Sequence, residues 1–168
     1  CEKRNIETVG VDIQEMDITD AAKVSSVIKE SNVDAVIHCS AYTAVDNAED
    51  NVDLCRAVNK NGPSNIVSVC KELDIPMMHF STDYVFSGEG TTPWQEYDQR
   101  NPVNVYGLTK YEGELAVESY PKHFIVRVSW TYGINGHNFV KTMLRLGKEK
   151  DELNVVNDQI GSPTCTAD

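Results

Sequence analysis

The stretch that decides the fold runs Pro76-Met77-Met78-His79-Phe80-Ser81-Thr82-Asp83-Tyr84-Val85-Phe86. Its first half is a short apolar run, which predicts a buried strand over 76–81. The polar side chains of Thr82 and Asp83 follow directly at the end of that strand. The run at 34–39, Asp-Ala-Val-Ile-His-Cys, has the same character and predicts another parallel strand, buried on both faces.

The rest of the chain alternates strand and helix patterns around these two runs. We expect further strands at 6–11, 124–130 and 155–156, and helices at about 20–31, 44–73, 104–119 and 137–149. Such alternation predicts an α/β fold with a doubly wound parallel sheet, Rossmann-like, covered by helices on both faces. In such sheets the ligand crevice lies beyond the carboxyl ends of the strands. Asp12, Ser40 to Thr43, Thr82 with Asp83, and Trp130 all follow predicted strand ends, so we expect one shared site there.

The composition limits the class of protein. The chain has 168 residues, 40% of them hydrophobic, with a formal net charge of −11 and no basic cluster, which argues against a nucleic-acid partner. No apolar run is long enough to span a membrane, so we expect no membrane partner. The five cysteines show no Cys-x-x-Cys spacing, which favours neither a disulfide framework nor a metal site. No signal peptide pattern opens the chain, and we expect a cytoplasmic protein.

The pair Tyr106 and Lys110 is the strongest indication of a catalytic site in the sequence. Residues four apart share one face of a helix, here the helix predicted at 104–119. A nearby ammonium favours a phenolate, so we expect Lys110 to lower the pKa of Tyr106. Tyr106 can then exchange a proton with a substrate oxygen, and Thr82 can hydrogen-bond the same oxygen. The competing interpretation is a chance spacing on a surface helix.

One expected part of a dinucleotide-binding fold is absent from these residues. Such folds open with a strand and a Gly-rich turn whose amides approach the pyrophosphate, and no such turn occurs here. We therefore expect residues 1–150 to form an incomplete NAD(P)-binding Rossmann-like domain, without its first strand and Gly-rich turn. Residues 151–168 would begin a substrate-binding region, so that the chain is truncated at both ends.

Several segments together resemble the dTDP-4-dehydrorhamnose reductase family, a branch of the extended short-chain dehydrogenases. The matching segments are Ala41-Tyr42-Thr43-Ala44-Val45-Asp46, Ser81 to Phe86, Asn104 to Lys110, Arg127 to Trp130, Asn138-Phe139 and Asn157 to Thr164. They cover nearly the whole chain in the right order.

The resemblance implies roles for particular residues. The implied catalytic trio is Thr82, Tyr106 and Lys110. The implied cofactor-binding residues are Asp12, Asp17, Ile18, Ala41, Tyr42, Thr43, Tyr106 and Lys110. The implied substrate-binding residues are Thr82, Asp83 and Trp130. Asp12 can accept the ribose hydroxyls of NADH and repel a 2′-phosphate, or be an ordinary loop acid. Asp17 either caps the next helix or faces adenine, and Trp130 either walls in the sugar nucleotide or belongs to the core.

The implied activity is reduction of the C4 keto group of dTDP-4-dehydro-6-deoxy-L-mannose to dTDP-L-rhamnose, with NADH or NADPH, for polysaccharide biosynthesis. The implied partner is a dTDP-sugar, and the resemblance allows a homodimer. Two alternatives stay open. One is a nucleotide-sugar epimerase or dehydratase of the same superfamily. The other is a non-catalytic dinucleotide-binding subunit similar to the regulatory subunit of methionine adenosyltransferase.

Overall fold

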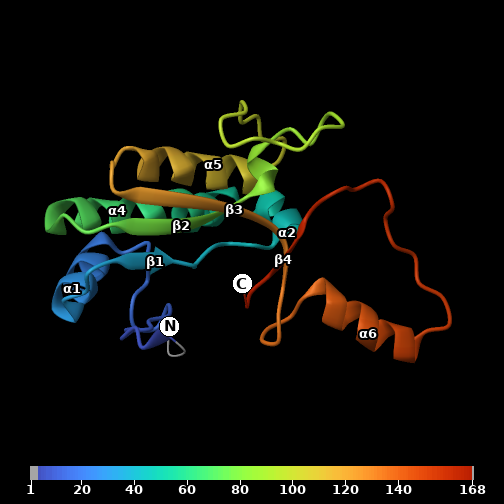
Figure 1. Ribbon diagram of the computed structural model, residues 1–168, viewed down its shortest axis with the longest axis horizontal. Coiled ribbons are helices and arrows are strands. Elements are labelled where there is room, and N and C mark those ends of the chain that lie inside the picture. Colours follow the sequence, from blue (N-terminus) through green and yellow to red (C-terminus); the bar gives the residue numbers. More distant parts are fainter. Residues whose placement is uncertain (1–3, 168) are drawn as a thin grey trace. The chain divides into compact units, whose positions relative to one another are not determined.

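The computed structural model describes residues 4–167 and divides into two compact units, one ending at Val126 and one beginning at Arg127. The elements along the chain are α1 (Ala21–Ser31), β1 (Val36–His38), α2 (Val45–Asp50), α3 (Val52–Arg56), the π-helical turn η2 (Ala57–Asn61), α4 (Gly62–Leu73), β2 (Met77–Thr82), the 3₁₀ turn η3 (Asp83–Val85), α5 (Val105–Glu118), β3 (His123–Tyr132), α6 (Phe139–Glu149) and β4 (Pro163–Cys165) (Figure 1).

The four strands form one sheet in the order β1-β2-β3-β4. β1 pairs with β2 in parallel, with Val36 opposite Met77 and His38 opposite His79. β3 pairs with β4 in parallel as well. The predicted parallel α/β fold is therefore confirmed, and the strand predicted at 76–81 lies within one residue of β2.

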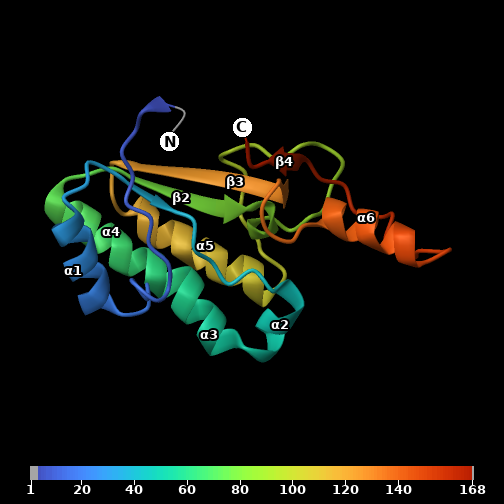
Figure 2. The same ribbon diagram turned by 90° about the horizontal axis from the view of Figure 1, so that it is seen from below.

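In the first unit, α1, α4 and α5 all cover the same face of β1 and β2 (Figure 2). Val24, Ile28, Ile66, Met77 and Val117 fill the space between these helices and the strands and are at most 5% exposed. The prediction that the strand at 34–39 is buried on both faces is wrong. Alternate strand residues point to opposite faces, and Ile37, on the face without these helices, is 57% exposed.

Two predicted strands are absent from the described residues. Residues 6–11 have no regular secondary structure and pair with no described strand, and a strand without a partner would leave its backbone groups unpaired. Residues 155–156 are irregular and exposed. The chain instead pairs with β3 further on, at β4, which begins with Pro163. Proline has no N–H to donate and is tolerated at the first position of a strand.

The long helical region predicted at 44–73 is broken, but not where expected. Gly62-Pro63 would be the place to expect a break, but the helix is interrupted at Asn51 and then continues from α3 through η2 into α4. Pro63 lies in the first turn of α4, where its missing N–H costs no helical hydrogen bond. The wider π-helical turn carries the buried Asn59, which becomes important for the site.

The outer edge of β1 borders a cavity of about 310 Å³, lined by Val9 to Val11, α1 and β1.

Within the described residues, no helix is long and apolar enough to cross a membrane.

Candidate active site

The residues of the predicted trio meet where β2 ends and α5 begins. Thr82 is the last residue of β2, and its hydroxyl caps η3 by accepting the Tyr84 N–H at 3.2 Å. Asn104 caps α5 by accepting the Gly107 N–H at 2.7 Å, which starts the helix just before Tyr106. A β-carbon at Gly107 would overlap the Tyr84 carbonyl oxygen. Glycine therefore allows the first turn of α5 to approach η3 closely.

Thr82 and Tyr106 are in hydrogen-bond contact. The Tyr106 ring also packs edge-on against Tyr84, with ring centroids 5.5 Å apart. Burial raises the pKa of Tyr106, the hydrogen bond from Thr82 acts in the opposite direction, and the charge of Asp83 raises the pKa further. The phenol is therefore protonated at neutral pH and can serve as a proton donor.

Lys110 lies one turn beyond Tyr106 and is only 2% exposed. Its ammonium donates to the Phe80 carbonyl on β2 at 2.6 Å. Burial lowers the pKa of Lys110 to about 8. The expectation that Lys110 lowers the pKa of Tyr106 is wrong in this structure, because the ammonium binds the backbone of β2 and burial of the phenol dominates.

Asp83 follows Thr82 and is half-buried. Its carboxylate accepts the Thr82 hydroxyl at 3.1 Å. Burial raises the pKa of Asp83, against hydrogen bonds that lower it. The predicted substrate residues Thr82 and Asp83 therefore form a connected polar pair at the end of β2.

Asn59, which the sequence analysis does not identify, connects η2 with the loop after β1 and with α5. Its side-chain oxygen accepts the Tyr42 N–H at 2.8 Å, and its amide donates to the Tyr42 carbonyl at 3.1 Å. The same amide lies 3.2 Å from the Thr109 hydroxyl on α5. The buried Asn59 thus holds the predicted cofactor loop, Ala41 to Thr43, to the helix that carries Tyr106 and Lys110. Sequence patterns do not reveal the π-helical turn that places it.

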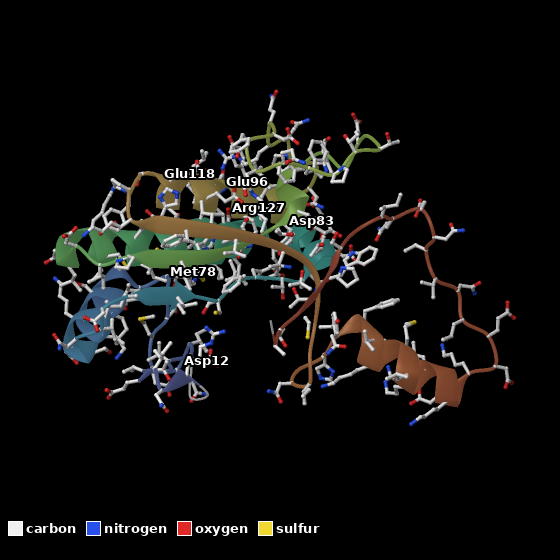
Figure 3. All side chains as sticks on the ribbon, in the orientation of Figure 1. Asp12, Met78, Asp83, Glu96, Glu118 and Arg127 are labelled. Atoms are coloured by element: carbon white, nitrogen blue, oxygen red, sulfur yellow. The ribbon has the colours of Figure 1, made fainter. Side chains whose placement is uncertain are left out.

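The residues predicted at the adenosine end lie elsewhere in the first unit. Figure 3 shows Asp12 and Asp83 apart, with Asp83 at the end of β2 and Asp12 beside β1. Asp12 is exposed, and its carboxylate accepts the Ile13 N–H at 2.7 Å. Asp17 accepts both Thr19 donors, which lowers its pKa, whereas Asp20 is the cap of α1. The Ile18 side chain is buried in the core. Their roles toward a cofactor stay predictions.

Trp130 belongs to the second unit. It is the extra residue of a bulge between the pairs Ser129–Pro163 and Thr131–Thr164, has φ +46, and is 48% exposed. A β-carbon at Gly161 would lie 2.9 Å from its indole ring. Trp130 is therefore not a core residue, and its role toward a substrate stays a prediction. Within residues 4–167 no cluster of His, Cys, Asp or Glu is arranged to hold a metal.

The parallel sheet and the helices that cover it define a Rossmann-like α/β domain. The profile described as RmlD substrate binding domain matches residues 1–168, and the chain belongs to this family.

Named relatives agree with this assignment. The dTDP-4-dehydrorhamnose reductase of Salmonella typhimurium is 44% identical over 159 residues, which are 90% of this chain and 53% of that protein. That of Sinorhizobium fredii is 45% identical over 153 residues, 90% and 52% of the two chains. The chain thus spans about half the length of the curated relatives it matches.

Solved structures show the same likeness. A dTDP-4-dehydrorhamnose reductase from Clostridium acetobutylicum matches with a TM-score of 0.94 and 45% identity, over 97% of this chain and 58% of that one. The reductase of Bacillus anthracis, solved in complex with NADP, matches with a TM-score of 0.95 and 43% identity, over 98% and 59% of the two chains.

Proposed function

We propose that the full-length protein is an NAD(P)H-dependent dTDP-4-dehydrorhamnose reductase, which converts dTDP-4-dehydro-6-deoxy-L-mannose into dTDP-L-rhamnose. The observation that carries this proposal is that Thr82 lies close enough to Tyr106 to act on its pKa, with the buried Lys110 on the next turn of the same helix. The names of the relatives supply the substrate class.

The residues fit the proton half of such a reduction. A reduced nicotinamide, when bound, supplies the hydride to C4 of the sugar. The keto oxygen then needs one proton, and Tyr106 holds one because burial raises its pKa. Thr82 can hydrogen-bond the same oxygen and orient it toward the phenol. The polar pair of Thr82 and Asp83 can also hold a sugar hydroxyl.

The described residues fit one part of an NAD(P) cofactor. Lys110 uses one of its three ammonium donors on Phe80, which leaves two for ribose hydroxyls. The loop Ala41 to Thr43, held by Asn59, follows the carboxyl end of β1, where ligands bind in such sheets. The amides for the pyrophosphate are not among these 168 residues, so cofactor binding is a property we assign to the longer protein.

A turnover assay separates this proposal from its alternatives. Full-length protein is incubated with the keto sugar and NADH or NADPH, and both oxidised cofactor and dTDP-rhamnose are quantified. A reductase gives the two products in equal amounts. An epimerase or dehydratase consumes no added cofactor, and a non-catalytic subunit changes neither compound; either result contradicts the proposal. The cytoplasmic location, a homodimer and the role in polysaccharide biosynthesis belong to the same proposal.

A further inference from the structure

Four polar side chains of α5 follow one another at intervals of four residues. Tyr106, Lys110, Glu114 and Glu118 therefore form one stripe along the helix. The first two belong to the proposed catalytic trio, and the last two are carboxylates that no step of the reaction uses. Glu114 is completely buried. A buried carboxylate is costly to keep unless it is paired, so its place next to Lys110 calls for a physical reason.

The charged surroundings of Lys110 single out Glu114. The groups that raise the pKa of Lys110 are Glu114 on α5 and then Cys55 on α3, against the larger effect of burial. On the strand side, His38 on β1 and His79 on β2 face the same ammonium. Both imidazoles are buried and neutral, so they offer no compensating charge. Within residues 4–167, Glu114 is the carboxylate among the groups that raise the pKa of Lys110.

Arg100, from the loop between η3 and α5, forms an ion pair with Glu114, which favours the charged form of the carboxylate. Its guanidinium lies 2.8 Å from Glu114 and 2.6 Å from Glu118, and stacks 4.6 Å above the centre of the Tyr111 ring. Arg100 thus contacts both carboxylates of the stripe. With a rise of about 1.5 Å per residue, Glu114 is about 6 Å from Lys110 along the helix axis, and Glu118 about 12 Å.

Resting on the proposed role of Lys110, we propose that Glu114 is a positioning residue whose carboxylate, held by Arg100, keeps the buried Lys110 ammonium charged. The loop that carries Arg100 is thereby linked to the site. Without this carboxylate, the ammonium would lose its proton near neutral pH, because burial alone disfavours the charge.

The direct test is an NMR titration that needs no substrate. Full-length protein carrying ¹³C-labelled lysine is titrated, and the Lys110 signal is assigned by its loss in Lys110→Met. We expect Glu114→Gln to lower the titration midpoint of Lys110 by at least about one pH unit, a tenfold change in the protonation equilibrium. Glu114→Asp, which keeps the charge, should restore most of it. The matched control is Glu118→Gln, which alters the same Arg100 pair on the same helix and should shift the midpoint by less than a third as much.

An unchanged midpoint in Glu114→Gln, or an equal shift in Glu118→Gln, would overturn the inference. Should Glu114→Gln fail to fold, the double variant Glu114→Gln/Arg100→Gln removes the same carboxylate together with its ion-pair partner, and the same shift is expected. The pH profile of kcat/KM is the second readout, and its basic limb should move with the NMR midpoint. A shifted midpoint with an unmoved profile would support the charge coupling and count against the proposed role of Lys110 in turnover.

Discussion

At the scale of single residues, the proposed chemistry depends on burial more than on neighbouring charge. Tyr106 remains protonated because its ring is covered, and Lys110 loses basicity for the same reason. The pair thus suits the donation of a proton to a substrate, which is the direction that a reduction needs.

Removing only the phenol oxygen tests the donor. We expect Tyr106→Phe to lower kcat by about 10²–10⁴-fold, the usual contribution of a general acid, and to leave cofactor affinity nearly unchanged because the ring stays. Steady-state kinetics and cofactor titration of the full-length protein measure both. Tyr97→Phe is the matched control, since Tyr97 is 88% exposed. Turnover of Tyr106→Phe within about threefold of the parent protein would remove Tyr106 from the donor role.

Asp12 supports a prediction about cofactor choice. Its exposed carboxylate would repel a 2′-phosphate, so we expect the full-length protein to bind NADH at least as well as NADPH. Asp12→Ala should improve NADPH binding relative to NADH. Glu7→Ala, which removes another exposed acid from the same N-terminal segment, serves as the control. Fluorescence titration decides the matter, and an NADPH preference that Asp12→Ala leaves unchanged would show that Asp12 does not contact the ribose.

At the scale of elements, close approach between helices holds the site together. A β-carbon at Gly113 of α5 would overlap the Asn59 carbonyl oxygen in η2. Both partners are backbone and cannot move away cheaply. The contact also keeps Asn59 within reach of Tyr42 and Thr109.

We therefore expect Gly113→Ala to lower the free energy of unfolding by about 1–3 kcal/mol, as overpacking does. Gly147→Ala is the control, because nothing lies within 4 Å of a β-carbon there. In the last turn of α6 it should instead stabilise, by at most about 0.5–1 kcal/mol. Urea unfolding measures both, and equal effects of the two substitutions would contradict the close-packing argument.

The pairing of β1 with β2 buries two histidines against each other. The Nδ1 atoms of His38 and His79 are 2.9 Å apart, and their rings stack 5.1 Å apart. Burial lowers their pKa values from 6.5 to about 3 and about 2, and the charge of Lys110 adds to this. Both imidazoles are therefore neutral in the folded protein.

This pair predicts how stability responds to acid. Below a pH of about 6.5 the two histidines are protonated in the unfolded chain but stay neutral in the folded protein. The free energy of unfolding therefore falls as the pH drops toward about 3. The loss approaches about 1.4 kcal/mol per pH unit for each histidine. We expect His38→Asn/His79→Gln to flatten this slope, as measured by urea unfolding at several pH values. The exposed His137→Gln should leave it unchanged, and an unaltered slope in the double variant would show that the pair does not carry the effect.

At the scale of the whole molecule, the outer edge of β1 and its apolar cavity of about 310 Å³ lie beside Asp12 and the loop after β1. In the strand order 3-2-1-4 the first strand of a dinucleotide-binding fold occupies a central position.

We predict that the 168-residue chain alone binds NADH and NADPH far more weakly than the full-length protein, because pyrophosphate amides at a Gly-rich helix start are not among these residues. Calorimetry on both proteins measures this, and micromolar binding by the 168 residues alone would contradict it.

The sequence by itself determined the parallel α/β fold and the helices that carry the site, with Tyr106 and Lys110 one turn apart. Those features depend on apolar runs, on helix caps such as Asn104 and on the four-residue spacing, all of which are local. The tertiary structure alone decided which strands pair, since residues 163–165, and not residues 155–156, pair with β3. It also decided the pKa of Tyr106 and the contacts of Asn59 and Glu114. Pairing, burial and charge coupling depend on residues far apart in the chain, which no local pattern records.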